Sequence, residues 1–263
     1  MSSVVIRIAK NEFSRCIGNP IVITATAFLC ISTLIFVAGQ YAYVQNSHAE
    51  PVDSNVLFLN NITGSAYFIS MALSFVSLCI GIVALAGERY RGSMRVLLTK
   101  PLYRRDIILG KFIGINFLML LLVIFVISIC IAFNIAAFGL PSAFSDDILR
   151  TVTLTILLFM QCMIFTSIVL FCGVIFKNLY MSLILSVSFF ILVWLMSWPF
   201  TWVDVLKLID PVVLYLTLIR NYSNVDISFL DWVSEILPYA VYMFLVILVI
   251  FIIDCYFFTN EET

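Results

Sequence analysis

Apolar residues along this chain form six long runs without a charged side chain, separated by short polar segments. Each run is continuously apolar rather than alternating, which favours helices over barrel strands, and each can hold a membrane-spanning helix of about 20 residues. The pattern therefore predicts an all-α integral membrane protein with six transmembrane helices. Their expected positions are about 21–43, 60–86, 107–138, 151–176, 179–199 and 236–258.

The composition of the 263 residues agrees with this pattern, because 63% are hydrophobic and only 11% are charged. A soluble domain is about half apolar and about a quarter charged. The longest segment expected outside the membrane, 201–235, is too short for a soluble catalytic domain of about 100 residues or more. No internal repeat or flexible linker is visible, so residues 1–263 are expected to form a single transmembrane domain.

Lysine and arginine are unevenly distributed over the segments that connect the predicted helices. If the N-terminus lies inside, eleven of the fourteen fall on the cytoplasmic side, where an excess is normal. This predicts a multi-pass protein of the cell membrane, plasma or inner, with both termini in the cytoplasm. The three basic residues left outside are Arg150, Lys207 and Arg220.

The segment 200–235, before the last predicted span, is too short for two spans and too apolar for a simple loop. Its central apolar piece follows Pro211, and Trp198, Trp202 and Trp232 flank that piece, as aromatic residues do at a lipid-water boundary. We expect short re-entrant or interfacial helices that cap the outer mouth. An ordinary outer loop that rests on the bilayer is an equally good interpretation.

Residue types that catalysis or metal binding needs are scarce. His48 is the only histidine, which excludes a Ser/His/Asp triad and a histidine metal site built from this chain alone. The only Gly-Lys pair, Gly110-Lys111, is followed by Phe112, so no phosphate-binding loop for ATP is present. The net charge of −1 gives no attraction to nucleic acid. We expect no enzyme activity, no catalytic residue, and no metal or cofactor in this chain.

Asp254 is the one acidic residue inside a predicted span, about one turn from the cytoplasmic end of that span. Proton-coupled transport through Asp254 is one interpretation. A single carboxylate near a span end is more often solvated at the headgroup level. An ion-coupled carrier that works without ATP therefore stays as an alternative, although no second charge inside the membrane supports it.

The segment 87–111, between the second and third predicted spans, holds seven of the fourteen basic residues. Within it, Met94, Leu97 and Leu98 have the i, i+3, i+4 spacing of a helix with an apolar stripe. Pro101 ends that helix, because the residue before a proline is pushed out of the helical region. The segment therefore predicts a short cytoplasmic helix.

A helix of about two turns is marginal in water by itself. Arg91 and Arg95, four residues apart, disfavour it further because they repel each other. The helix makes sense when a partner protein covers the stripe and pairs with the arginines. Alternatively, the arginines only satisfy the inside-positive bias and contact anionic lipid.

The residues of this segment resemble the first cytoplasmic loop of type-2 ATP-binding-cassette (ABC) transporter permeases. In that family the loop carries a coupling helix, which docks into a cleft of the ATPase subunit. The resemblance implies a coupling loop over 87–106 in which Arg91, Met94 and Arg95 also contact the ATPase. The residues that carry the resemblance are Glu88, Gly92, Ser93, Leu97, Leu98, Thr99, Pro101, Arg104, Gly110 and Lys111.

Two further segments are similar to parts of the same family. The stretch 2–18 resembles the amphipathic elbow helix that lies along the inner leaflet before the first span, with Lys10, Glu12 and the following Pro20 as its characteristic residues. The short turn at Lys177 and Asn178 occupies the place of the family's second, smaller cytoplasmic contact. Six spans with a re-entrant segment before the sixth also agree with the family's layout.

The resemblance implies the permease subunit of an ABC transporter, with export as the family's usual direction. Its expected partners are a second permease chain, the surrounding lipid bilayer and two copies of a separate ATPase. The ATPase would bind the ATP and Mg²⁺. Six spans are half of the usual twelve. The second permease chain is therefore expected to form a homodimer or a heterodimer with this one. Some relatives serve in metalloenzyme maturation or peptide immunity, so a membrane assembly or immunity factor is a further alternative.

The sequence does not identify the substrate. The helices expected to face the pathway carry Asn116, Asn134 and Gln161 and many apolar residues but no buried charge, which favours an apolar or amphiphilic cargo. Gly110 and Gly114 have the small-residue spacing that permits close contact between helices.

Overall fold

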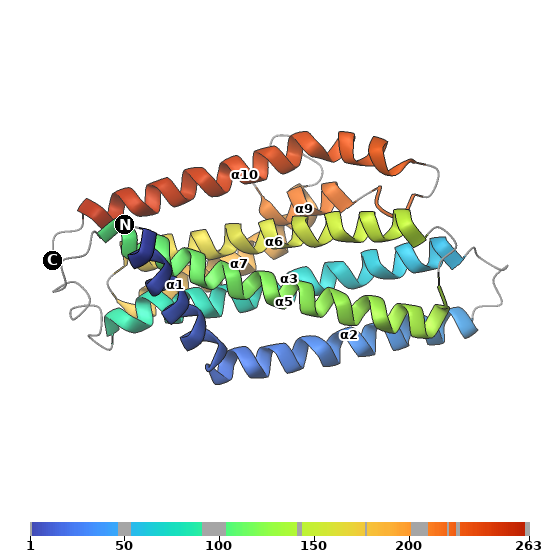
Figure 1. Cartoon of the computed structure of the whole chain (residues 1–263), viewed down its shortest axis with the longest axis horizontal. Coiled ribbons are helices and arrows are strands. Elements are labelled where there is room, and N and C mark those ends of the chain that lie inside the picture. Colours follow the sequence, from blue (N-terminus) through green and yellow to red (C-terminus); the bar gives the residue numbers. More distant parts are fainter. Residues whose placement is uncertain are drawn as a thin grey trace.

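The computed structural model describes residues 2–46, 54–90, 104–140, 144–176, 178–200, 210–219, 221–224 and 227–260. In these ranges every regular element is a helix. Figure 1 shows the long helices side by side along one axis, while α1 crosses them obliquely at one end. The helices are α1 (Ser2–Ile17), α2 (Pro20–Asn46), α3 (Ser54–Tyr90), α5 (Arg104–Phe138), α6 (Phe144–Ile175), α7 (Leu179–Phe200), α9 (Pro211–Ile219) and α10 (Phe229–Asn260).

The long helices alternate in direction along the chain. We call the end at which α1 lies and α10 finishes the α1 end, and the opposite end the far end (Figure 1). Because of the alternation, α3 finishes and α5 begins at the α1 end, whereas α2 finishes and α3 begins at the far end.

The predicted all-helical membrane fold is confirmed. Five helices, α2, α3, α5, α6 and α10, are long and apolar enough to cross a membrane, and each covers nearly the whole span predicted for it. A sixth apolar helix, α7, coincides with the predicted fifth span, but its apolar stretch, Leu179–Leu195, is shorter than those of the other five.

Local sequence signals explain where several helices begin and end. Pro20 is the first residue of α2, a position where its missing N–H costs nothing. Gly139 follows α5 with φ of +85°, a left-handed conformation that glycine adopts without strain. Ser228 caps α10, because its hydroxyl accepts the N–H of Asp231 at 3.3 Å and donates to that carboxylate at 2.7 Å.

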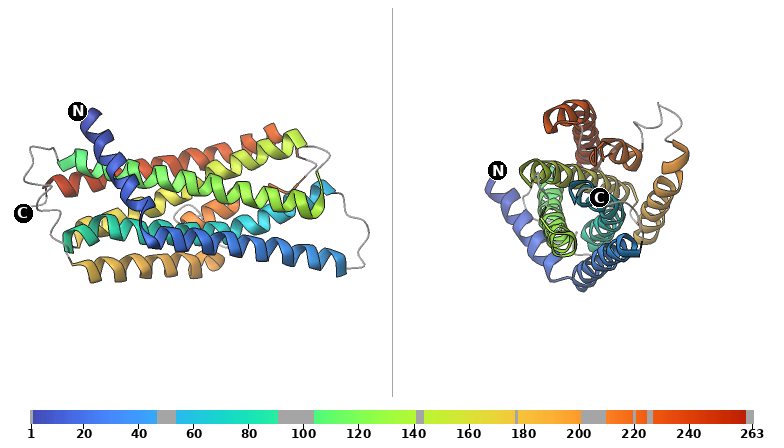
Figure 2. Two further views of the ribbon diagram at one scale, coloured as in Figure 1. Left: turned by 60° about the horizontal axis from the view of Figure 1, so that its bottom comes forward. Right: turned by 90° about the vertical axis from the view of Figure 1, so that its right-hand side faces the viewer.

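Helices α3 and α6 form the centre of the bundle, and α2, α7 and α10 surround them, as the end-on view in Figure 2 shows. In the most apolar stretches of α3 and α6, 67% and 61% of the residues are buried inside the bundle. In those of α2 and α10, only 22% and 17% are buried. The outer helices thus leave large apolar faces for lipid or another chain.

Close contact between α3 and α6 depends on small and polar side chains. A Cβ added at Gly81 of α3 would lie 2.8 Å from Val169 of α6, so only glycine fits there. The hydroxyls of Ser77 and Thr166 lie 2.7 Å apart, and Ser77 also donates to the carbonyl of Cys162. Such bonds are useful in a membrane, where no water can satisfy these groups.

The apolar piece after the fifth span is the helix α9, which packs against α6, α7 and α10 and lies along the bundle rather than beyond its end (Figure 1). Seven of its nine residues are buried. This burial favours the re-entrant interpretation, which stays a prediction. The prediction for Trp232 is wrong, because its ring is fully buried 5.7 Å from Tyr222 instead of lying at the surface.

Arg150 joins the segment between α9 and α10 to α6. Its guanidinium group donates to the carbonyls of Tyr222 at 2.8 Å and Asn224 at 2.9 Å, and also to that of Ile227. The neighbouring Thr151 hydroxyl lies 2.9 Å from the hydroxyl of Tyr222. Arg150 is only 4% exposed, so three backbone carbonyls replace water around a cation at the far end of the bundle.

Candidate functional site

The segment predicted to couple to an ATPase leaves from α3 and returns to α5, and both helices have the relevant terminus at the α1 end (Figure 1). Glu88 lies in the last turns of α3, and Arg104 is the first residue of α5. Nine of the predicted contact residues lie outside the described ranges: Arg91, Gly92, Ser93, Met94, Arg95, Leu97, Leu98, Pro101 and Lys177.

Asn178, the other predicted residue of the second contact, is described and exposed at the α1 end of α7. Its side-chain oxygen accepts the N–H of Tyr180 at 3.0 Å, which is the bond of a helix cap. The described part of the turn therefore has a local structural role, and it leaves Asn178 at the surface.

The predicted elbow segment is the helix α1, which crosses α5 in unusually close contact. A Cβ added at Gly110 would lie 2.7 Å from the side chain of Ile8, and one at Gly114 would lie 2.6 Å from the carbonyl oxygen of Ala9. Only glycine at these two positions lets the backbones approach so closely. The predicted close contact thus exists, and its partner is α1 of the same chain.

An ion pair lies at this crossing. The ammonium group of Lys111 on α5 lies 3.2 Å from a carboxylate oxygen of Glu12 on α1 and donates to the carbonyl of Ala84 on α3 at 2.8 Å. Arg15 lies 3.1 Å from the other oxygen of Glu12. Glu12 and Lys111 are only 3% and 1% exposed. We call these residues, Glu12, Arg15, Ala84 and Lys111, the junction.

The junction joins α1 to both helices that bear the coupling loop. Ala84 precedes the loop and Lys111 follows it, so one ammonium group connects the two sides of the loop's base. A buried ion pair is costly to break, because removal of one partner leaves an uncompensated charge in a dry place. The sequence indicated Glu12 and Lys111 separately, as parts of two motifs, but contained no signal for their contact.

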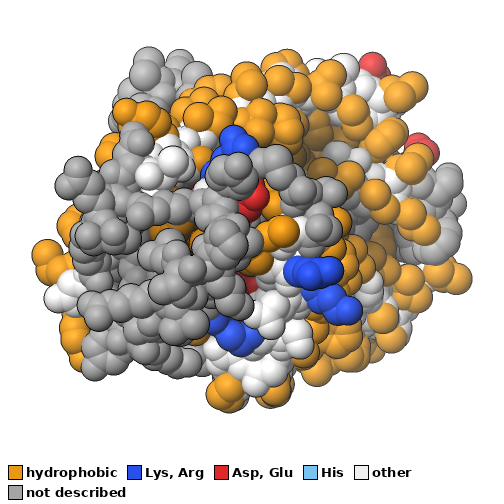
Figure 3. All heavy atoms as spheres, turned by 60° about the vertical axis from the view of Figure 1, so that its left-hand side comes forward, with side chains coloured by type: hydrophobic (Ala, Val, Ile, Leu, Met, Phe, Trp, Pro, Cys, Tyr) orange, Lys and Arg blue, Asp and Glu red, His pale blue; other side chains and the backbone are white. Residues whose placement is uncertain are grey.

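Exposed basic side chains gather around the junction. Arg7, Lys10 and Arg15 lie on the outward face of α1, and Arg105 lies in the first turn of α5. Figure 3 brings this end forward and shows Lys and Arg in separate clusters on it. Arg105 lies 3.8 Å from Asp106, a loose pair that leaves most of its side chain at the surface. The predicted residue Lys10 is thus a surface residue, while Glu12 is interior.

A large groove lies between α2, α3 and α7 and has a volume of about 930 Å³. Four phenylalanines line it, and its polar or sulfur-bearing lining residues are Thr24, Ser32, Met71 and Cys79. The aromatic lining residues are Phe28, Phe68, Phe75 and Phe190. Such a lining can accept an apolar chain but offers no charged partner to a polar solute.

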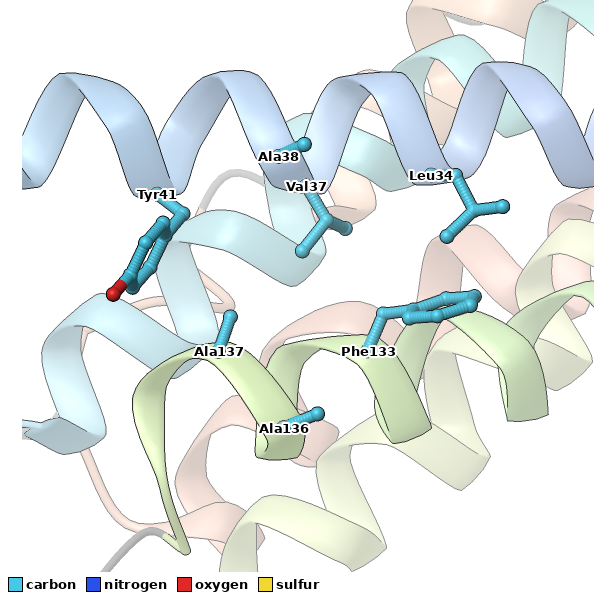
Figure 4. Close-up of a pocket in the computed structure, with 7 residues that line it drawn as sticks. All are labelled: Leu34, Val37, Ala38, Tyr41, Phe133, Ala136 and Ala137. Carbon is cyan, nitrogen blue, oxygen red and sulfur yellow. The ribbon is translucent and has the colours of Figure 1, made fainter.

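A smaller groove of about 360 Å³ lies between α2 and α5. Figure 4 shows Leu34 and Val37 of α2 facing Phe133 of α5, with Tyr41 at one end of the groove. Ala38, Ala136 and Ala137 leave the space open, because small side chains do not fill it. Tyr41 also packs on Phe138, with ring centroids 5.9 Å apart. Both grooves thus open beside α2.

The three amides carried by the helices expected to face the pathway are buried between helices of this chain and line neither groove. Asn116 and Asn134 donate to carbonyls of their own helix, at 2.9 and 2.8 Å, and Gln161 donates to Ser74 at 3.5 Å. The expected absence of buried charge is wrong, since the bundle buries Glu12, Lys111 and Arg150 among others.

Metal-binding chemistry has little support in the part of the chain that the structure describes. No group of three or more His, Cys, Asp or Glu side chains lies close enough together there to hold a metal ion. All seven cysteines lie in helices, and none of them forms a disulfide.

Comparison with known families gives one match. The family described as ABC-2 family transporter protein matches residues 6–263, from the first turns of α1 through α10 and beyond. A comparison with curated proteins finds no match. The matched range includes the junction, both grooves and the segment between α3 and α5.

Proposed function

Because this chain belongs to the ABC-2 family of transporter proteins, we propose that it is the permease subunit of an ABC exporter that is driven by a separate ATPase. Permeases of this family normally pair with an ATPase subunit. The observation that carries the proposal is the junction. It attaches α1, α3 and α5 to one another at the base of the loop that resembles the family's coupling helix.

The mechanism follows from the rigidity of that attachment. When two ATPase copies close on ATP, each moves a coupling loop through contacts at Met94, Leu97 and Leu98. The loop cannot move alone, since Lys111 and Ala84 bind its two sides together and Glu12 adds the elbow helix. The α1 ends of α3 and α5 therefore move as one body and carry α2, which packs against both, with them.

We place the α1 end in the cytoplasm. Its exposed basic residues, Arg7, Lys10 and Arg105, follow the inside-positive bias. The basic face of α1 would lie against anionic headgroups of the inner leaflet, as expected for an elbow helix. An ATPase in the cytoplasm would then meet the loop between α3 and α5.

The second permease chain is proposed to meet this one on the side of α2 and α7. Gly110 and Gly114 are not free for that contact, because α1 covers them. Both α2 and α7 instead leave large apolar side chains exposed, among them Phe28, Ile35 and Ile184. A twofold dimer on this side would enclose the larger groove next to the partner, where a pathway between two chains belongs.

The cargo that fits this arrangement is apolar or amphiphilic. The larger groove presents phenylalanine faces, a thiol and two hydroxyls, and it opens sideways between α2 and α7. An amphiphile could enter from the membrane with its apolar part against the phenylalanines. A highly charged solute would find no counter-ion there, and its transfer from water would be costly.

Copurification with the ATPase tests the proposal. The chain is coexpressed with a candidate ATP-binding-cassette ATPase from the same organism, and the membranes are extracted in mild detergent. The double variant Leu97→Asp, Leu98→Asp is expected to insert normally and to lose the ATPase, because two charges then lie on the docking stripe. The control Leu140→Asp places a charge on an exposed far-end residue and keeps the ATPase. Equal ATPase retention by both variants would overturn the proposed coupling site.

A further inference from the structure

Asp254 near the α1 end of α10 is the most isolated charged residue of the described bundle. Its side chain is 0% exposed, and neither carboxylate oxygen has a hydrogen-bond partner. This differs from the solvated helix end that the sequence suggested. The carboxylate points into the bundle, toward α6, rather than toward lipid headgroups.

Among the residues whose side chains the structure describes, the neighbours of Asp254 offer no counter-charge. From α6, Cys172 lies within electrostatic range, and Cys255 follows on α10 itself. From α5, Lys111 is occupied by Glu12 and by the carbonyl of Ala84. The remaining packing partner, α9, contains no charged residue between Pro211 and Ile219.

Glu12 provides a direct comparison inside the same molecule. Both carboxylates are buried, but Glu12 has a cation at each oxygen, whereas Asp254 has none. Burial of an ionised carboxylate without partners is far more costly than burial of the neutral acid. The packed arrangement of α6 and α10 therefore requires a proton on Asp254.

We infer that Asp254 is a proton-binding site whose occupancy is linked to the packing of α10 on α6. The carboxyl group keeps its proton while the two helices are packed as in this structure. When their α1 ends separate and water enters, the O–H bond breaks, the electron pair stays on the carboxylate, and the proton passes to that water. The site goes beyond ATP coupling, since it gives the conformational equilibrium a dependence on pH.

The direction of this dependence follows from proton counting. The packed arrangement binds one proton more than the separated arrangement at neutral pH. Mass action therefore favours packing in acid, and it favours separation as the pH rises. Asp254→Asn keeps the shape of the neutral acid and removes the titration, so it is expected to keep the helices packed at every pH.

Infrared spectroscopy of the full-length protein in lipid nanodiscs tests the site directly. The protein carries isotope-labelled aspartate, so that aspartic and glutamic acid bands are separated. At neutral pH we expect a band from a protonated aspartic acid in an apolar setting, and we expect its loss in Asp254→Asn. Asp146→Asn, a change at an exposed carboxylate, serves as the matched control and keeps the band. Asp210→Asn identifies any contribution from Asp210, a second buried aspartate with one oxygen that has no hydrogen-bond partner.

The wild-type spectrum alone can overturn the inference. If labelled wild-type protein shows no protonated aspartic acid at neutral pH, Asp254 is ionised and the inference fails. It fails equally if the band is lost with Asp210→Asn and survives in Asp254→Asn. Asp254→Leu provides a second variant should the asparagine fold poorly, because leucine suits the apolar surroundings and also eliminates the band. Neither result depends on ATPase binding, so the proposed function can stand or fall separately.

Discussion

Lys111 of α5 lies with its ammonium nitrogen 3.2 Å from the Oε2 atom of Glu12 on α1, in the buried space at the base of the loop between α3 and α5. The two residues are far apart in sequence, and each belongs to a different motif. Their contact turns the elbow helix and the start of α5 into one mechanical unit. The first two predictions concern this unit.

Lys111→Met should destabilise the protein strongly, because it takes the buried cation away from the buried carboxylate of Glu12 and removes the donor from the carbonyl of Ala84. Breaking a buried pair in this way costs about 3 to 5 kcal/mol. The double variant Glu12→Gln, Lys111→Met should lose less than the sum of the two single losses. Thermal unfolding of all four proteins in detergent measures the coupling, and additive losses would show that the pair does not act as a unit.

Gly114→Val should push α1 away from α5. A Cβ at this position would lie 2.6 Å from the carbonyl oxygen of Ala9, and backbone cannot yield as a flexible side chain would. Overpacking of this kind costs about 1 to 3 kcal/mol. A cysteine placed at Ile8 should then become reactive to a water-soluble maleimide. The control Gly39→Val, at a site with nothing within 4 Å, should leave that cysteine protected. Equal labelling in both variants would contradict the close crossing.

Arg150→Met should release the segment between α9 and α10 from α6. The guanidinium group bonds the carbonyls of Tyr222, Asn224 and Ile227, and each buried carbonyl left unsatisfied costs about 1 to 3 kcal/mol. Hydrogen exchange measured by mass spectrometry should show faster exchange over 221–236, while peptides from α3 exchange as before. Unchanged exchange over 221–236 would mean that Arg150 does not hold this segment.

The prediction of six apolar helices from sequence succeeded because continuous apolar runs of this length have few alternatives in a membrane protein. The faces of those helices are harder to predict. α10 is apolar on nearly every side, so the pattern alone did not reveal that Asp254 points inward. The nine-residue α9 has the same apolar pattern whether it lies on a bilayer or inside a bundle. Burial of Trp232 in α10 depends on Tyr222, which lies before that helix begins.

The candidate site was predictable in part for a related reason. Motif spacing placed Glu12 and Lys111 in the elbow and in the coupling segment, but pairing between residues so distant in sequence needs the crossing geometry of α1 and α5. The spacing of Gly110 and Gly114 predicted a close contact without specifying its partner. Asn116, Asn134 and Gln161 are buried between helices of this chain. A polar residue in an apolar span serves either a pathway or helix packing, and sequence does not separate the two.

The stability of the packing around α9 should depend on pH through Asp210, which caps α9. Burial raises the pKa of Asp210 above its ordinary value of 3.8, although its Oδ1 atom accepts N–H bonds from Val212 and Val213. The folded state thus binds this proton more tightly than the unfolded state. Its stabilising effect is complete below the ordinary pKa and declines as the pH rises through the raised one.

Asp210→Asn preserves the cap, since asparagine is as good at this position, and removes the titrating group. The temperature of thermal unfolding should therefore fall less steeply between about pH 4 and about pH 7 in the variant than in the wild type. Identical slopes in the two proteins would exclude Asp210 as a contributor to the dependence.

The central claim is that an ATPase transmits its motion to this chain through the loop between α3 and α5. A photoreactive amino acid at position 97 of the full-length chain, coexpressed with the ATPase, tests that contact in the intact membrane. The account predicts a light-dependent adduct with the ATPase from position 97 and none from position 140 at the far end. An ATPase that copurifies with the chain but forms no adduct from position 97, or forms an equal one from position 140, would contradict it.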